Sequence, residues 1–317
     1  MNRKAASEGG PTEEAPVEQT SDGPPLSAEP APPGWESLGL DLASTVVLAE
    51  TAEAEFMLAL HDGAPAEART TLGMRSERVA GGVAVVMAGD PTGGYWNKAL
   101  GFGVTEPVTE DLVTHLVDLY ASAGAPALCL QLAPSALPDD WDDVCARHGI
   151  VAGSVWAKLL RPAATPPTPS TTDLRVGRIG AEGADAYARV LAAGFGMPPE
   201  PHLLSMFAAA AAGGTGFTAY GAWDGDTLVA AATLHLTGAA AAFCGAATLP
   251  EARGRGAQSA FMGVRVEAAR AAGCPWMSAE TWQELEGSHN PSLHNMRRSG
   301  FVEVYDRRNW VWRGGRS

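Results

Sequence analysis

The spacing of apolar positions predicts a regular order of helices and strands in the C-terminal part of the chain. Apolar residues recur with helical spacing over 259–272, and the apolar run over 274–281 predicts a strand. A short helix that ends in the sequence MRRSGF at residue 301 and a strand over 302–312 complete the order. Gly273 and Gly300 stand where helices commonly end in a left-handed residue.

The same order occurs earlier in the chain. The predicted helix, strand, helix and strand cover 109–123, 125–133, 139–150 and 153–160. Gly124 corresponds to Gly273 and Gly149 to Gly300, at offsets of 149 and 151 residues. Two pairs of glycines with nearly the same offset indicate that the chain contains a repeat.

A hairpin precedes these elements in the second copy. Residues 216–236 contain two apolar strands joined by Asp224-Gly225-Asp226, which is a turn signal. The run over 240–249 predicts one further strand, and residues 101–107 predict a strand of the first copy that leads almost directly into its helix. Clustered strands followed by strands mixed with helices predict an α+β fold.

Two segments lack hydrophobic periodicity. Residues 1–35 are rich in Glu, Pro, Ser, Ala and Gly, and we expect a disordered tail because they cannot bury enough apolar surface to offset the entropy of ordering. Residues 161–172, RPAATPPTPSTT, predict a Pro-rich linker. The predicted domains are therefore 36–160 and 173–317.

Charge and cysteine usage exclude several classes of function. The net charge of −14 argues against a nucleic-acid partner, which usually requires a basic face. No run of 18 consecutive apolar residues predicts a membrane span, and the N-terminus lacks the apolar core of a secretory signal. The four cysteines show no metal-ligand spacing. We therefore expect a cytoplasmic protein with reduced cysteines, no bound metal and no membrane partner.

The clearest candidate chemistry lies in the loop PEARGRGA, residues 250–257. Gly254 and Gly256 let the backbone turn sharply and approach a ligand closely. The loop runs into a helix N-terminus, whose free N–H groups and dipole favour phosphate oxygens, and Arg253 and Arg255 add positive charge. The loop is not a Walker loop, because Gly-Lys-Ser/Thr is missing, and it lacks the third glycine and distal acid of a dinucleotide fingerprint.

This C-terminal block resembles the GCN5-related N-acetyltransferase (GNAT) superfamily. The family's pyrophosphate loop, R/Q-x-x-G-x-G/A, is similar to residues 253–258, although Gln258 stands where the family usually has Gly or Ala. Residues 290–292, Asn-Pro-Ser, and 298–301, Arg-Ser-Gly-Phe, are similar to its closing motif. The resemblance covers roughly the range 173–312.

The resemblance implies two tandem GNAT-like domains, each a mixed, mostly antiparallel sheet flanked by helices, with strands four and five splayed in the C-terminal copy. It implies an N-acyltransferase that uses acetyl-CoA or another acyl-CoA and a small-molecule or peptide amine. The pantetheine arm would pair with strand four, and a backbone N–H near Ala247 would polarise the acyl carbonyl. The cofactor-binding residues so implied are Ala247, Thr248, Leu249, Arg253, Gly254, Arg255, Gly256, Ala257, Gln258, Asn290 and Asn295.

Several residues are candidates for the general acid and the general base. Many family members place a Tyr four residues before the Gly-Phe as the acid for the thiolate, but Met296 stands there and cannot donate a proton. The catalytic candidates are Glu280, Asn295, Ser292 and Tyr305, with His294 nearby and His235 as a second possible base. Asn295 or Ser292 can hydrogen-bond a thiol without titrating. Structural roles are the alternatives: an ion pair for Glu280, and packing for Tyr305 and His235.

The first block lacks the Arg-Gly-x-Gly loop, and we expect a degenerate copy that binds no CoA and shapes the acceptor pocket. Two alternatives to acylation of a small amine are acylation of a protein N-terminus or lysine, and a non-catalytic protein that binds acyl-CoA or a partner. The missing Tyr supports the second alternative, and the intact loop argues against it. The oligomeric state is not predicted.

Overall fold

The computed structural model describes residues 35–285 and 287–314. The predicted tail falls almost entirely outside these residues. After a short 3-10 helix (Trp35–Leu38), the first block consists of α1 (Leu42–Asp62), α2 (Ala66–Thr71), β1 (Met74–Val79), β2 (Gly82–Met87), β3 (Lys98–Leu100), α3 (Glu110–Ser122), β4 (Ala127–Gln131), α4 (Trp141–His148) and β5 (Ile150–Pro162).

The second block repeats this order with two additional strands: β6 at its start, and two short strands, β9 and β10, where the first block has β3. It consists of β6 (Arg175–Ile179), α5 (Ala184–Gly194), α6 (Pro201–Ala211), β7 (Phe217–Asp224), β8 (Thr227–Leu236), β9 (Ala240–Ala242), β10 (Ala246–Thr248), α7 (Ala257–Ala271), β11 (Trp276–Trp282), α8 (Pro291–Arg298) and β12 (Val302–Arg313). The four anchor glycines of the predicted repeat, Gly124, Gly149, Gly273 and Gly300, all have φ between 66° and 84°. The left-handed conformation inferred from the sequence is therefore present at each of them.

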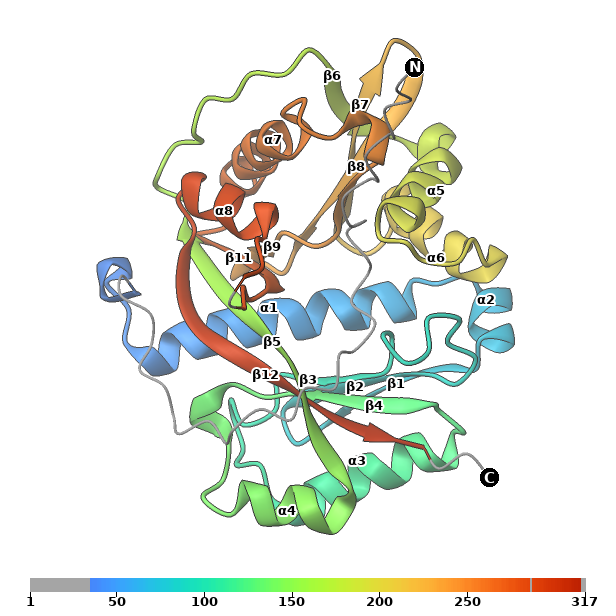
Figure 1. Ribbon diagram of the computed structural model, residues 1–317, viewed down its shortest axis with the longest axis vertical. Coiled ribbons are helices and arrows are strands. Elements are labelled where there is room, and N and C mark those ends of the chain that lie inside the picture. Colours follow the sequence, from blue (N-terminus) through green and yellow to red (C-terminus); the bar gives the residue numbers. More distant parts are fainter. Residues whose placement is uncertain (1–34, 286, 315–317) are drawn as a thin grey trace, which may run out of the picture.

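The two blocks exchange their last strands. The sheet order is β1-β2-β3-β4-β12-β5-β11-β9-β8-β7-β6, so β5 of the first block pairs with β11, and β12 of the second block pairs with β4. The two exchanged strands also pair with each other, and Figure 1 shows them crossing between the halves. Because of this exchange, the blocks predicted over 36–160 and 173–317 share one continuous sheet.

Two predicted strands differ from the structure. Residues 101–107 form turns, because β3 ends at Leu100 and the chain reverses through Gly101 and Gly103, which both have positive φ. The predicted strand over 240–249 is broken into β9 and β10 by residues 243–245. Both short strands pair with β8, but only β9 also pairs with β11.

Helices cover the sheet through separate apolar clusters. One cluster joins α1 with α5 and α6, a second joins α7 and α8 with β11, and a third joins α3 and α4 with the strands of the first block. Helix α1 crosses the middle of the molecule between the two halves (Figure 1). It places Glu50 and Glu53, both almost fully buried, against the exchanged strands. In the described part of the chain, no helix is long and apolar enough to span a membrane.

Candidate functional site

A large cavity, about 1230 Å³ in volume, lies between the two blocks. The second block lines it with β10, the loop after β10, the first turn of α7 and part of α8. The first block contributes Tyr95, Lys98, Cys129 and Trp156. The cavity is therefore a shared feature of both blocks and large enough for a ligand of considerable size.

The sheet opens along one side of this cavity. Strand β9 pairs with β11 only as far as Ala242 and Ser278, whereas β10 pairs only with β8. The N–H of Leu249 donates to Val229 of β8 at 2.9 Å. Because hydrogen-bonded pairs alternate along an antiparallel ladder, the N–H groups of Ala246 and Thr248 face the open side. The free donors thus flank Ala247, the position expected from the sequence.

The first turn of α7 presents unused backbone donors. Gly256, the N-cap, has φ of 83°, and no side chain caps the helix. No hydrogen bond recorded among the described residues uses the N–H groups of Ala257, Gln258 or Ser259, and all three residues line the cavity. Gly256 also approaches the linker so closely that an added Cβ would lie 2.4 Å from the carbonyl oxygen of Thr171. These amides form the type of site that favours phosphate groups.

The corresponding region of the first block is closed. Strand β3 pairs with both β2 and β4 along its whole length. Helix α3 is capped by Thr109, whose hydroxyl accepts a hydrogen bond from the N–H of Leu112 at 3.2 Å. The opening and the uncapped helix of the second block are therefore both missing from this part of the first block.

The two arginines of the loop point in different directions. Arg253 lines the cavity, and its Nε donates to the carbonyl of Thr248 at 3.3 Å. Arg255 forms ion pairs with Asp173 and Asp224, each at 2.6 Å, and does not line the cavity. These two carboxylates raise the pKa of Arg255. Its side chain therefore forms exposed ion pairs with the start of the second block and with the end of β7, on the side of the loop away from the cavity.

Gln258 connects α7 with α8 at the cavity wall. Its side-chain amide donates to the hydroxyl of Ser292 at 2.8 Å, and its carbonyl oxygen accepts from the amide of Asn295. All three residues line the cavity. The candidates Ser292 and Asn295 are thus at the site, held in place by the residue that departs from the family pattern.

Asn290 has a structural role in this arrangement. Its side-chain oxygen accepts from the N–H groups of Ser292 and Leu293, which caps α8, and its amide donates to the carbonyl of Trp282 at 2.6 Å. Asn290 is fully buried and does not line the cavity. Leu249 does not line the cavity either. The side chains of Asn290 and Leu249 are therefore not in a position to contact a ligand in the cavity.

Glu280 lies at the cavity wall within a buried network of charges. The network contains three carboxylates, Glu50, Glu53 and Glu280, and two cations, Lys158 and Arg307. Glu280 contacts Arg307 at 2.8 Å and Lys158 at 3.3 Å, and of the three carboxylates only Glu280 is partly exposed, at 14%. Burial first, and then the neighbouring charge of Glu53, raise the pKa of Glu280 to about 7. The network contains one carboxylate more than it has cations, so one carboxylate is poorly compensated. Glu280 is the carboxylate of the three that binds a proton most readily.

Two of the candidate side chains are not at the cavity. Tyr305 is buried, its hydroxyl donates to Glu50 at 2.6 Å, and it does not line the cavity. Burial raises its pKa well above the usual value. Its suggested catalytic role is therefore not supported by its position. His235 bonds to the carbonyl of Thr215 at 3.0 Å and also lies off the cavity, whereas His294 lines it.

One group in the described part of the chain has the donor types of a metal site. The ligand atoms of Glu284, His289 and His294 lie within 4.8 Å of one another. Glu284 already accepts hydrogen bonds from the backbone N–H of Asn290 and from His294, and His289 is 70% exposed. This group is therefore a hydrogen-bonded cluster whose two histidines lie at the edge of the cavity.

The structure adds residues that the sequence did not suggest. Glu53, Lys158 and Lys98 are charged side chains that are almost completely buried near the cavity. The sequence contained one indication of these residues, namely a charged residue at a position expected to be in the core. Glu53 lies on the apolar face of a long helix, and Lys158 lies in an otherwise apolar strand. Buried charges require partners, so each of these positions indicates a built polar site.

Comparisons with solved structures show a GNAT fold. A GCN5-related N-acetyltransferase from Kribbella flavida matches with a TM-score of 0.55 and 17% identity, over 85% of this chain and 96% of that one. One from Sphaerobacter thermophilus matches with a TM-score of 0.52 and 15% identity, over 86% and 94% of the two chains. A tandem GNAT protein from the clavulanic acid biosynthesis pathway matches with a TM-score of 0.50 and 15% identity, over 88% and 98%.

No family model and no curated protein matches the chain. The likeness therefore concerns the fold, and it spans nearly the full length of each solved structure described above. Within this fold, the chain has a repeated order of elements, exchanged last strands and one opened sheet edge. This chain has the fold of the GCN5-related N-acetyltransferases, in their tandem form.

Proposed function

We propose that the protein is an acyl-CoA-dependent N-acyltransferase whose acyl-CoA site lies in the second block. The observation that carries this proposal is the combination of an uncapped α7 and an open edge of β10 on one cavity. Free amides at a helix N-terminus suit a pyrophosphate, and an open strand edge suits the amide-containing pantetheine arm. The residues present therefore fit the co-substrate that the fold suggests, with acetyl-CoA as its simplest form.

The backbone supplies the donor side of the proposed site. The N–H groups of residues 257–259 hold the pyrophosphate, and Arg253 adds a positive charge at the cavity wall. The free N–H groups of Ala246 and Thr248 are the candidates for polarising the acyl carbonyl as negative charge develops on its oxygen. Because backbone donors are held by the sheet and the helix, they are already oriented before the reaction.

Glu280 is the proposed general base. It follows Ser278 on β11, beyond the last residue that pairs with β9, so it stands where the sheet opens. A carboxyl group with a pKa of about 7 can accept the proton of a bound ammonium near neutral pH. The amine nitrogen then forms a bond to the acyl carbon and gives up a second proton to solvent, the carbon–sulfur bond breaks, and the thiolate leaves with the electron pair.

The thiolate has no titrating acid at the position where the family usually has Tyr. Met296 lines the cavity there and cannot donate a proton. Ser292 and Asn295 line the same wall, and we propose that one of them donates a hydrogen bond to the leaving sulfur. The final proton then comes from solvent or from Glu280.

The position of the first block favours a small acceptor. Tyr95, Lys98 and Trp156 of the first block line the cavity together with the loop residues of the second block. A protein N-terminus or lysine would need an open groove, whereas a walled cavity admits a free amine. We therefore propose a small-molecule amine as the acceptor.

A matched pair of substitutions at Gly254 tests the acyl-CoA site. Gly254 has φ of 78°, lines the cavity, and has no atom within 4 Å of an added Cβ. Asn and Asp tolerate this conformation similarly, so Gly254→Asn and Gly254→Asp differ mainly in charge. A carboxylate about 6 Å from a phosphate charge costs about 3 kcal/mol at an effective dielectric constant of 20, or roughly a hundredfold in affinity.

We expect calorimetry to show acetyl-CoA binding that is nearly unchanged in Gly254→Asn and lost or strongly weakened in Gly254→Asp. Equal affinities of the two variants would show that the phosphates bind elsewhere. Absence of acetyl-CoA binding in the unsubstituted protein would overturn the proposed function.

A further inference from the structure

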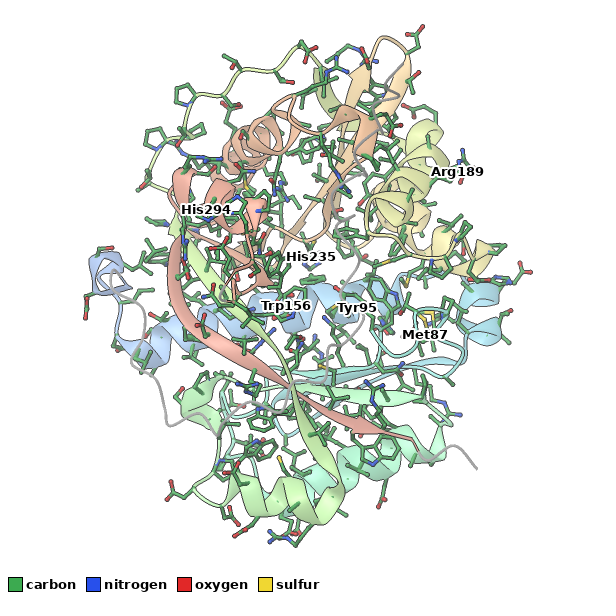
Figure 2. The ribbon with its side chains drawn as sticks, in the orientation of Figure 1. Met87, Tyr95, Trp156, Arg189, His235 and His294 are labelled. Carbon is green, nitrogen blue, oxygen red and sulfur yellow. The ribbon has the colours of Figure 1, made fainter. Side chains whose placement is uncertain are left out.

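Lys98 is a buried cation that faces the cavity from the first block. It lies on β3, a central strand that pairs with both β2 and β4, and its side chain is only 4% exposed. Its ammonium contacts the ring of Tyr95 at 4.5 Å and that of Trp156 at 5.8 Å. All three side chains line the cavity. Tyr95 and Trp156 lie close to the centre of the molecule in Figure 2.

This ammonium has no carboxylate partner in the described part of the chain. No ion pair or hydrogen bond recorded there involves its nitrogen, although an ammonium has three donors to satisfy. The carboxylates of Glu53 and Glu280 form their ion pairs with Lys158 and Arg307 instead. Burial alone would disfavour this charge, and the carboxylates of Glu280 and Glu53 favour it from beyond ion-pair distance, while the nearest contacts of the ammonium are the two ring faces.

The other titratable neighbours do not supply a negative charge. Burial raises the pKa of Cys129, which pairs with Lys98 across the strands, to about 11. Burial and the charge of Lys98 lower the pKa of His61 to about 3. Burial also raises the pKa of Tyr95. All three groups are therefore uncharged near neutral pH. The pKa of Lys98 is raised despite burial, in part by the charges of Glu280 and Glu53, but neither carboxylate forms an ion pair with it, so its ammonium faces the cavity without a direct acidic partner among the described residues.

The cavity thus presents a cation and the proposed base at two separate places along its wall. Trp156 and Lys158 are two residues apart on β5, about 7 Å along one face of the strand. Trp156 contacts Lys98, and Lys158 contacts Glu280. A path along this face leads from the free cation, past an aromatic wall, to the proposed base. A ligand that matches this path carries an anion at one end and an amine at the other.

We propose that Lys98 binds a carboxylate of the acceptor, so that the acceptor is a small amino-carboxylic compound whose body packs on Tyr95 and Trp156. This inference rests on the proposed function, because Glu280 is assigned to the amine end. It assigns the first block a role in acceptor recognition. Lys98 is a binding residue in this scheme and does not take part in proton transfer.

The test uses two probes that differ only in the carboxylate. The compound 4-(aminomethyl)benzoate has an amine and a carboxylate at opposite ends of a ring, and 4-methylbenzylamine has a methyl group in place of the carboxylate. We expect calorimetry to show that the unsubstituted protein binds the carboxylate probe about tenfold or more tightly than the amine probe. Equal affinities, or no binding of the carboxylate probe, would overturn the inference without the use of any variant.

Substitutions at Lys98 provide a second test of this inference. Lys98→Met keeps the length and removes the charge, and we expect it to abolish the preference for the carboxylate while acetyl-CoA binds as before. Lys98→Arg keeps the charge, and we expect it to retain part of the preference. A preference that persists in a folded Lys98→Met protein would contradict the inference. Failure of acetyl-CoA to bind to the unsubstituted protein would instead contradict the proposed function, so the two failures are distinguishable.

Discussion

The charge network around Glu280 leads to an unusual prediction for the substitution Glu280→Gln. The folded protein raises the pKa of this carboxyl from 4.5 to about 7. At 1.36 kcal/mol per pH unit, this difference corresponds to about 3 kcal/mol. Between these two pH values Glu280 binds more protons in the native state than in the unfolded state, so the contribution of this group to stability falls as pH rises through the window, whereas His61, with its lowered pKa, contributes with the opposite sign.

Glu280→Gln removes this titration and leaves two carboxylates facing two cations. We therefore expect the variant to be at least as stable as the wild type at pH 8, and the stability of the variant relative to the wild type to rise by about 3 kcal/mol between pH 4.5 and 7, because the contribution of His61 is common to both proteins. Urea unfolding at several pH values measures this directly. Glu303→Gln is the control, because Glu303 pairs with Arg297 and does not line the cavity.

The same substitution has the opposite effect on catalysis. A base with a pKa of about 7 predicts that kcat rises with pH up to about 7 and then levels off. Loss of general-base catalysis lowers kcat by about 10² to 10⁴. Release of the CoA thiol with any amine that the wild type acetylates measures both effects. A Glu280→Gln enzyme with wild-type kcat, or with the wild-type dependence of stability on pH, would refute the reasoning.

Three further substitutions separate structural from ligand-binding roles. Tyr305→Phe removes a buried hydrogen bond to Glu50, so we expect a loss of about 1–3 kcal/mol in urea unfolding with kcat unchanged; a large fall in kcat without a loss of stability would contradict this. Gly256→Ala places a Cβ against Thr171 at a positive φ, and we expect a lowered Tm in thermal unfolding together with weaker binding of acetyl-CoA. Arg255→Ala changes a side chain outside the cavity, and its affinity for acetyl-CoA in calorimetry should stay within about twofold of the wild type.

Local signals in the sequence predicted a considerable part of the second block. The glycines and the helix start at 254–257 identified a turn and an uncapped helix without long-range information, because both depend on neighbouring residues. Gly124 and Gly273 anchored the repeat for the same reason. Glu280 was found as a candidate from its place at the end of an apolar strand.

Features that depend on contacts between the blocks could not be predicted in this way. The exchange of β5 and β12 leaves the apolar pattern of each strand unchanged, so the sequence does not show which sheet a strand joins. Tyr305 looked like a candidate acid, but its orientation is determined by Glu50, 255 residues earlier in the chain. Lys98 was overlooked because the block that contains it lacks the recognisable loop.

The number and place of the acyl-CoA sites test the central claim most directly. We would titrate acetyl-CoA into the full chain and into Gly254→Asp by calorimetry, with Gly254→Asn as the matched control. One site per chain, present in Gly254→Asn and absent in Gly254→Asp, is the predicted result. Two sites per chain would contradict the assignment of a single site to the second block, and an unchanged site in Gly254→Asp would contradict its location at α7.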